Sequence, residues 1–365
     1  MTCTISARIS SIHSHSSTMT IRPSTHAGSW YSSDPLTLST EITDWLSQVA
    51  NSIKKVTLPV SDARVIIAPH AGYSYSGAAA AFAYAALSLT SNIRRIFLLG
   101  PSHVWYLNKC ALSTHTHYAT PAGTLPIDTL TVAALRATGK FVNMPPEIDE
   151  REHSLEMHLP YIFHLVSRTF KSAAQYPALV PILVGNTNAA TEVDYGRILA
   201  PYLADSTNLF IISSDFCHWG LRFSYTYYLP EGKKENEGHD LQMHDSNPTN
   251  PAIHESIAKL DKAVMDTIET GSHSAFLRNL KTTGNTVCGR HPIGIILAAL
   301  ENLEIQSKED IGESEISDPD IQVDSSQTAN KKYKFKFLRY ERSSEVVDIS
   351  DSSVSYASAY ATLRE

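Results

Sequence analysis

Residues that can bind a metal ion or move a proton stand at the ends of short apolar runs. One run precedes His70, a second precedes His103, and a third precedes Asp215 and, three residues later, His218. In open α/β sheets, the loops after the carboxyl ends of neighbouring parallel strands meet at one edge, where ligands bind. A lone loop histidine is usually structural, but four titratable groups in matching positions predict a shared pocket.

Cys288 is a further candidate because it shortly precedes a helical pattern that starts near Ile293. The positive end of a helix and the neighbouring Arg290 would both favour the thiolate, the form of cysteine that binds metals or attacks electrophiles. The alternative is a small buried cysteine that fills a gap in the core. Both interpretations stay open at this point.

The densest group of titratable residues is the segment 152–158, EHSLEMH. On a helix, His153 and Glu156 would share a face, as would Glu152 and Glu156. The segment resembles the HExxH zinc motif only superficially, because Glu156 stands at the wrong position. Its leucines would equally well anchor a structural helix on the core, so the two alternatives are balanced.

Two segments combine histidine, glycine and aromatic residues, HAGSWY at 26–31 and PHAGYSYSG at 69–77. Their glycines permit close backbone approach, and Trp30 and Tyr75 can line a pocket. Neither is a phosphate-binding loop, since the sequence contains no GxxxxGK[ST] and no GxGxxG. It also has no GxSxG, which counts against an α/β-hydrolase.

The elements that must position these residues alternate along the chain. Apolar runs of strand length occupy 65–68, 96–99, 180–184 and 209–212, and helical patterns occupy 40–49, 77–87, 253–268 and 293–303. Short, wholly apolar runs suit strands that are buried on both faces. The alternation predicts a single α/β domain with a largely parallel central sheet flanked by helices.

The pattern changes near the end of the chain. Aromatic residues alternate with lysines at 333–337, and Val354 and Tyr356 alternate with serines. Such alternation predicts two half-buried strands, paired antiparallel at a sheet edge.

The domain is predicted to span 21–365, with mobile insertions at the polar segments 231–250 and 306–330. Residues 1–20 are interpreted as a disordered or mis-started leader, with Met19 as the usual start. Their Ser/Thr-rich, acid-free composition also weakly resembles a transit peptide.

Composition excludes several classes of protein. The formal charge is −7 with scattered signs, so no basic face predicts nucleic-acid binding. No apolar run approaches the about 18 residues that a membrane span requires. The four cysteines are widely spaced without a CxxC pair, which favours a reducing compartment. We therefore expect a cytoplasmic protein, with the nucleus as a second location.

Seven motifs in fixed order resemble the Memo family, named after a mediator of receptor-driven cell motility. They are HAGSWY, APHAGYSYSG, GPSH, EHSLEMHLPY, SSDFCHWG, CGRHPIG and DSSVSYAS. The resemblance covers Ile21 to Ala361 apart from the two polar segments. It implies a fold similar to the class III extradiol dioxygenases, which cleave catechol rings with non-haem iron.

The resemblance also implies a metal pocket. Family members hold a metal with two histidines and a cysteine, which match His70, His103 and Cys288. Positions beside that pocket or on its rim are matched by Asp215, His218, Trp30 and Tyr75. The family is associated with iron and copper, redox activity, phosphotyrosine peptides and the cytoskeleton.

Cys288 marks a departure from the dioxygenases, because non-haem Fe(II) oxygenases commonly carry a carboxylate as their third ligand. A thiolate is softer and favours Cu(I) or zinc on ligand type alone. Ring cleavage is therefore not carried over with the fold.

Three functions stay open. The first is a protein that binds one iron or copper ion per chain and has a redox or cell-motility signalling role; any catalysis would be assisted by Asp215, His218 and Cys288. The second is an adaptor for phosphotyrosine or other anionic peptides, with signalling or cytoskeletal partners, using Trp30, Tyr75 and Arg290. The third is a metal-free hydrolase with Cys288 as nucleophile and a histidine as base.

Overall fold

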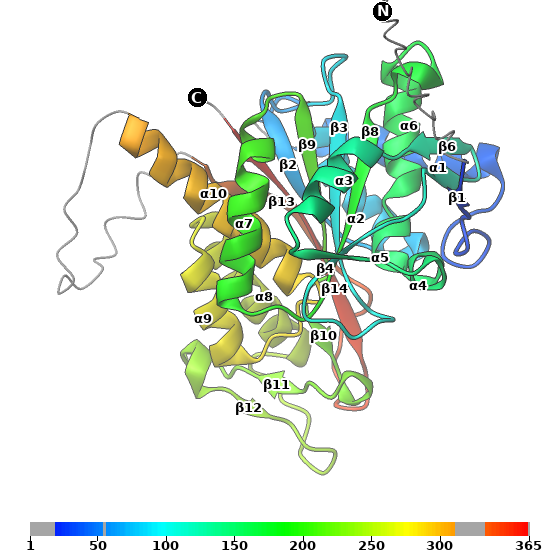
Figure 1. The fold of residues 1–365 in the computed structure, drawn as a ribbon. Helices are drawn as coiled ribbons and strands as arrows, with labels where there is room; N and C mark the ends of the chain where they lie inside the picture. The colour runs from blue at the N-terminus through cyan, green and yellow to red at the C-terminus, as the bar shows by residue number, and fades with distance from the viewer. Residues whose placement is uncertain (1–18, 54–55, 311–332, 364–365) are drawn as a thin grey trace, which may run out of the picture.

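Parallel strands form the centre of the main sheet in the computed structural model, which describes residues 19–53, 56–310 and 333–363 (Figure 1). In spatial order they are β2 (Ala63–Ala68), β9 (Asn208–Ser213), β3 (Arg95–Pro101) and β8 (Ala178–Val184). Almost every residue in them is buried, as the apolar runs predict. The predicted α/β fold with a largely parallel central sheet is confirmed.

Antiparallel strands complete the sheet. Beyond β8 lie β4 (Cys110–Leu112) and β7 (Phe141–Asn143), and beyond β2 lies β14 (Ser353–Thr362), flanked by β13 (Phe335–Arg342) and β10 (His218–Trp219). β14 runs antiparallel to both β2 and β13. The predicted antiparallel pair at the sheet edge is therefore confirmed, with β14 joining it to the parallel core.

Helices cover both faces of the sheet (Figure 1). On one side lie α1 (Pro35–Ser52), α2 (Tyr73–Ala86) and α6 (Leu159–Thr169); on the other lie α7 (Ala189–Ala204), α8 (Ile253–Glu269), α9 (His273–Thr283) and α10 (Arg290–Asp310). Gly196 lets α7 approach α10 closely, because a Cβ there would lie 2.8 Å from the Ala299 nitrogen. Every helix among the described residues is too short or too polar to cross a bilayer.

Three helices begin earlier than predicted, among them α10, which starts at Arg290. α1 starts at Pro35, because the Asp34 side chain accepts a hydrogen bond from the Thr37 nitrogen and caps the helix. α2 starts at Tyr73. Its first turn mixes serine and tyrosine, so the sequence pattern becomes clearly helical only from Gly77 onwards.

Small elements complete the chain. They are β1 (Ile21–Arg22), β5 (His117–Thr120), β6 (Gly123–Pro126), α3 (Thr129–Ala137), α4 (Pro146–Arg151), α5 (His153–Glu156), η1 (Ala173–Gln175), η2 (Leu221–Phe223), β11 (Tyr227–Tyr228), η3 (Glu235–Glu237) and β12 (His239–Asp240). The segment 231–250 contains η3 and β12, and β12 pairs with β11. Of the segment 306–330, the first residues extend α10, and 311–330 lie outside the described residues, as do residues 1–18.

Candidate metal centre

His70, His103 and Cys288 come together at the carboxyl end of the parallel strands. His70 follows β2, His103 follows β3, and Cys288 stands just before α10. One ligand atom from each residue lies within 4.8 Å of the other two. Bonds of about 2.0–2.3 Å place two ligands of one ion roughly 3–4.5 Å apart, so this donor set fits a metal ion after small side-chain adjustments.

The His70 ring is oriented by Ser213, the last residue of β9. The Ser213 hydroxyl donates to the Ser154 carbonyl at 2.7 Å, so it accepts from Nδ1 of His70 at 2.6 Å. This arrangement leaves the lone pair of His70 on Nε2, which faces the Cys288 sulfur at 3.2 Å. Burial, and then the nearby His103, hold the pKa of His70 well below its usual range, so the ring is a neutral ligand.

The His103 ring is oriented by Glu152. The carboxylate accepts from the His103 backbone N–H at 2.7 Å and from Nδ1 at 2.9 Å, which leaves Nε2 available as a ligand atom. Burial alone would raise the pKa of Glu152, but the hydrogen bond and charge of His103 outweigh it and lower the pKa to about 2. Glu152 is therefore a permanent acceptor for the ring, in the manner of a carboxylate behind a metal-ligating histidine.

The sulfur of Cys288 is half-buried among polar partners. It accepts a hydrogen bond from the Asp215 backbone N–H at 3.2 Å, and it also lies 3.4 Å from the Asp215 carbonyl. Burial, and then the charge of Asp215, raise the pKa of the thiol well above its usual range. The prediction that the helix start and Arg290 favour the thiolate is wrong for the metal-free protein, because desolvation and a buried carboxylate outweigh both.

Asp215 and His218 lie beside the three ligands. Oδ1 of Asp215 accepts from the His70 backbone N–H at 2.8 Å, while Oδ2 lies 4.0 Å from His70 Nε2. Asp215 therefore fixes the backbone of His70, whereas Ser213 and Glu152 orient the two ligand rings. Nδ1 of His218 donates to the Phe216 carbonyl at 2.8 Å, so that Nε2 is the ring atom that can accept a proton.

His153 is a third imidazole in the pocket that the sequence pattern left undecided. The centroid of its ring lies 4.3 Å from that of His103, on which it stacks, and 4.5 Å from that of Trp30, to which it is tilted. It meets His70 edge-on, with the ring centroids 5.4 Å apart. Burial, and then His103, lower its pKa to about 4. The segment that carries His153 is not one continuous helix, because α5 ends at Glu156 and α6 starts at Leu159.

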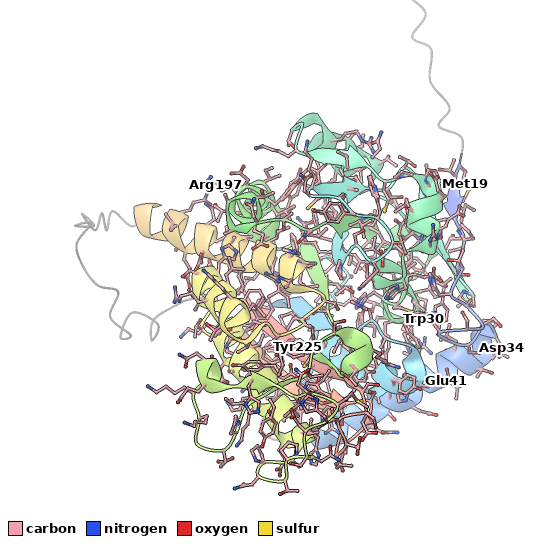
Figure 2. The ribbon with its side chains drawn as sticks, turned by 90° about the horizontal axis from the view of Figure 1, so that it is seen from below. Met19, Trp30, Asp34, Glu41, Arg197 and Tyr225 are labelled. Atoms are coloured by element: carbon pink, nitrogen blue, oxygen red, sulfur yellow. The ribbon has the colours of Figure 1, made fainter. Side chains whose placement is uncertain are left out.

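The predicted rim residues differ in position. Trp30 packs on His153 and is half-buried, whereas Asp34, labelled near the outline of the molecule in Figure 2, is exposed. Tyr75 is 63% exposed on the first turn of α2. Arg290 is exposed at the start of α10, and no described contact joins its side chain to the three ligands.

A buried arginine holds the segment that carries Glu152 and His153. Arg22 is fully buried and donates to Glu156 Oε2 at 2.7 Å, Asp149 Oδ1 at 3.1 Å and the Glu152 carbonyl at 2.9 Å. Burial alone would raise the pKa of Glu156, but the hydrogen bond from His26 and the charge of Arg22 lower it to about 2. Nothing in the sequence marks Arg22 for this role, because its partners lie far from it along the chain.

A buried aspartate supports the opposite wall of the pocket. Asp261 on α8 accepts from the Cys217 backbone N–H at 3.1 Å, from Asn285 Nδ2 at 3.1 Å and from the Tyr340 hydroxyl at 2.9 Å. Burial raises its pKa. Asp261 thereby joins the loop of Asp215 and His218 to the loop of Cys288.

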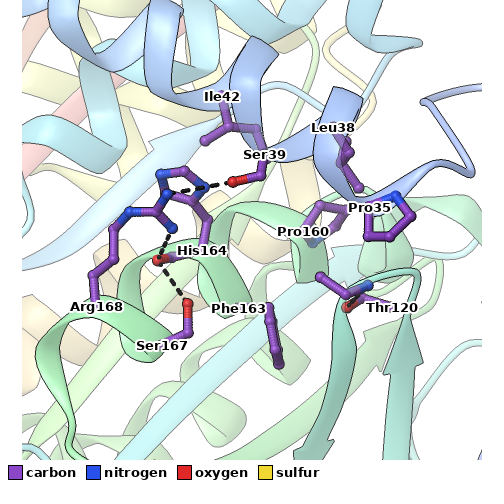
Figure 3. Close-up of a pocket in the computed structure, with 11 residues that line it drawn as sticks. Pro35, Leu38, Ser39, Ile42, Thr120, Pro160, Phe163, His164, Ser167 and Arg168 are labelled. Atoms are coloured by element: carbon purple, nitrogen blue, oxygen red, sulfur yellow. Dashed lines mark hydrogen bonds between the residues drawn. The ribbon is translucent and has the colours of Figure 1, made fainter.

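A separate cavity of about 80 Å³ lies between α1 and α6 (Figure 3). Its walls are mainly apolar. Arg168 donates to the His164 carbonyl of its own helix at 3.2 Å and reaches Ser39 Oγ on α1 at 3.3 Å. None of the predicted site residues lines it, so it is distinct from the candidate metal centre.

Comparison with known proteins agrees with the motif order. A family model described as Memo-like protein matches residues 22–360. Protein MEMO1 of Danio rerio is 42% identical over 342 residues, which cover 94% of this chain and 97% of the relative. The Homo sapiens MEMO1 protein is 39% identical with the same coverage, and the memo-1 homolog of Caenorhabditis elegans is 40% identical over 92% of this chain and 81% of its own.

An uncharacterized Escherichia coli K12 protein of known crystal structure shares 12% identity with a TM-score of 0.38, over 80% of this chain and 98% of that chain. A likeness of this size adds nothing to the assignment, which rests on the family model and the relatives. They confirm the resemblance inferred from the motifs: the chain belongs to the Memo-like family.

Proposed function

We propose that the pocket binds one iron or copper ion through Nε2 of His70, Nε2 of His103 and Sγ of Cys288, for a redox or cell-motility signalling role. The convergence of these three donor atoms within 4.8 Å carries the proposal. Both histidines already have Nδ1 engaged, so each presents its other nitrogen to the pocket. A bound iron or copper ion would supply one-electron redox chemistry.

The protein groups around the ligands are suited to handling protons. Cys288 must lose its proton to become a ligand, and a cation next to the sulfur offsets the desolvation that disfavours the thiolate. His218 offers a free Nε2 beside the pocket, and His153 offers a neutral ring against His103. His218 can accept the released proton, whereas the lowered pKa of His153 disfavours that role for its ring.

Metal content by mass spectrometry, on protein purified without an affinity tag, tests the proposal. Wild-type protein is expected to carry iron or copper, and a variant with His70→Ala, His103→Ala and Cys288→Ser is expected to carry none. Cys110→Ser is the matched control, because Cys110 is a buried cysteine on β4 outside the pocket. Equal metal in the triple variant, or no uptake by reduced wild-type protein on anaerobic reconstitution, would contradict the proposal.

The peptide adaptor is a second candidate, favoured by the exposed ring of Tyr75 near the same end of the sheet. Titration of a phosphotyrosine peptide against wild-type, Tyr75→Ala and Arg290→Gln proteins would test it. Weaker binding by both variants is expected. Unchanged affinity would count against an adaptor at this pocket.

The metal-free hydrolase is a third candidate, favoured by the 3.2 Å separation of Cys288 Sγ and His70 Nε2. A nucleophilic thiolate predicts rapid alkylation of Cys288 by iodoacetamide at neutral pH, followed by peptide mass spectrometry. Alkylation no faster than that of a free cysteine would contradict this candidate and agree with the raised thiol pKa.

A further inference from the structure

We propose that a chain of aromatic side chains behind the pocket, all buried except Trp45, carries single electrons to the pocket, and that Tyr84, paired with His158, is the residue finally oxidised. We define the aromatic chain as Tyr31, Trp45, Tyr73, Tyr84 and Tyr161. The oxidant that removes the electron is in the pocket and is either an oxidised metal ion or a thiyl radical on Cys288. This part of the inference rests on the proposed function.

The rings of the aromatic chain are in direct succession. Their centroids lie 5.5 Å apart for Tyr31 and Tyr73, 5.6 Å for Tyr73 and Tyr161, and 4.5 Å for Tyr161 and Tyr84. The last two rings are stacked with an interplanar angle of 5°. Such contact favours electron exchange between neighbours and spreads the charge of an oxidised ring over its partner.

The aromatic chain reaches the pocket at one end. Trp30 is the sequence neighbour of Tyr31, and its ring lies 4.5 Å from that of His153. His153 in turn contacts the rings of both His70 and His103. The path from the candidate ligands to Tyr31 therefore contains only aromatic side chains and one peptide link.

A branch leads towards the surface. The Trp45 ring lies 5.8 Å from Tyr73 and 6.4 Å from Tyr161, and the residue is only half-buried. Within this set, only a phenol that is hydrogen-bonded to a base is easier to oxidise than the indole ring of Trp45. Trp45 thus gives external electron donors or oxidants access to the buried tyrosines.

The hydroxyl partners single out Tyr84. The hydroxyls of Tyr73 and Tyr161 donate to backbone carbonyls, which cannot take up a proton. The Tyr31 hydroxyl donates to Glu156, whose carboxylate already forms an ion pair with Arg22. A proton on Glu156 would weaken that ion pair.

Tyr84 has a better proton acceptor. Its hydroxyl lies 2.8 Å from Nδ1 of His158, and both residues are buried. Burial lowers the pKa of His158 to about 3, but an oxidised phenol is a far stronger acid than such an imidazolium, so Nδ1 still takes up the proton. Nε2 of His158 has no hydrogen-bond partner among the described residues, so this transfer breaks no existing ion pair. His158 has no other role in the candidate metal centre.

The step balances as a proton-coupled electron transfer. The oxidant gains one electron, Tyr84 loses one, and the phenolic proton moves to Nδ1 of His158. The products are a neutral tyrosyl radical and an imidazolium. Once the electron has left, the Tyr84–His158 pair carries one positive charge whether the proton is on the phenol or on the imidazole. The proton moves to His158 because imidazole is a far stronger base than a phenoxyl radical.

Metal-free Cys288→Ser protein, oxidised with photogenerated ruthenium(III) tris-bipyridine and frozen for EPR, tests the proposal. A long-lived tyrosyl signal with coupling to an imidazole nitrogen is expected. Tyr84→Phe should lose that signal, and His158→Gln, which keeps a polar side chain but no base, should lose the nitrogen coupling and shorten the lifetime. Tyr228→Phe, which removes another buried tyrosine bonded to a backbone carbonyl, should leave the signal intact.

An unchanged signal in Tyr84→Phe, or none in any variant whose circular dichroism matches wild type, would overturn the proposal. An unaltered coupling in His158→Gln would overturn the role of His158. Because the protein in this experiment contains no metal, either result leaves the proposed metal centre to be judged by its own metal-content measurement.

Discussion

Replacing Arg22 by methionine should destabilise the protein more than any exposed charge substitution. The guanidinium is fully buried, and its removal leaves the carboxylates of Asp149 and Glu156 without a cation in the same region. Methionine fills a similar volume but donates no hydrogen bond. The Glu152 and Glu150 carbonyls also lose a donor, so the segment behind His103 loses its anchor.

The expected loss is about 3–5 kcal/mol, the range for removing one partner of a buried ion pair. The pKa of Glu156 gives a second estimate of this loss. A pKa of about 2 instead of 4.5 means that the folded protein favours the ionised carboxylate by about 3 kcal/mol, and His26 and Arg22 share this effect. Since this pKa is lowered, its stabilisation is complete above pH 4.5 and is lost as the pH falls through about 2. The variant should therefore lose less of its stability on acidification than wild type.

Urea denaturation followed by tryptophan fluorescence, at pH 7 and at several lower pH values, measures both effects. Arg197→Met is the matched control, because Arg197 forms an exposed pair with Asp194 and its loss should change the free energy of unfolding by no more than about 0.5 kcal/mol. Arg22→Lys should fall between the two, since an ammonium keeps the charge but not the fork of donors. A loss below about 1 kcal/mol for Arg22→Met, with an unchanged pH dependence, would refute the reasoning.

Substitutions at three further positions test the pocket and its supports. Glu152→Gln should weaken metal binding about 10–100-fold in a competition titration with a chelating dye, because a carboxylate behind a ligand histidine is lost; Glu150→Gln should not, and equal affinities would remove Glu152 from the site. Gly289→Ala should cost about 1–3 kcal/mol in urea denaturation, since its Cβ would lie 2.3 Å from the Ser214 Cβ; Gly72→Ala, whose nearest contact is 3.6 Å, should be tolerated. Asp261→Ala should cost at least about 2 kcal/mol by leaving buried donors unpaired. Asp261→Asn should cost less, because a raised carboxyl pKa means that the buried charge itself destabilises the fold at neutral pH; a larger loss for Asn than for Ala would contradict this account.

Local pattern was sufficient to predict the fold and the ends of the parallel strands. The apolar runs before His70 and His103 are buried on both sides, so their sequences report their environment directly. The grouping of these histidines followed from the topology of parallel sheets. Cys288 was found as a candidate through its place before a helix, and its pairing with the histidines came from the family resemblance.

The supporting residues were not predictable in the same way. Ser213 and Glu152 orient the two histidine rings from segments distant in sequence, and a serine or glutamate carries no pattern that marks such a contact. Arg22 and Asp261 are buried against the general preference for charged residues to be exposed, so composition alone points away from them. The protonation of Cys288 depends on desolvation, which only the three-dimensional structure reveals.

The position of β14 has a consequence for how the protein is made. β2 lies near the beginning of the chain and β14 near the end, yet Ala359 pairs with Ile67 in the sheet. During synthesis on a ribosome, that edge of β2 stays unpaired until β14 has emerged, and an unpaired apolar edge invites aggregation. The loop of Asp215 is also fastened late, because the Phe216 backbone N–H bonds to the Ser355 carbonyl. The loop of Asp215 is therefore anchored only once Ser355 has been synthesised, so an ion that reaches the pocket earlier meets a loop without this anchor.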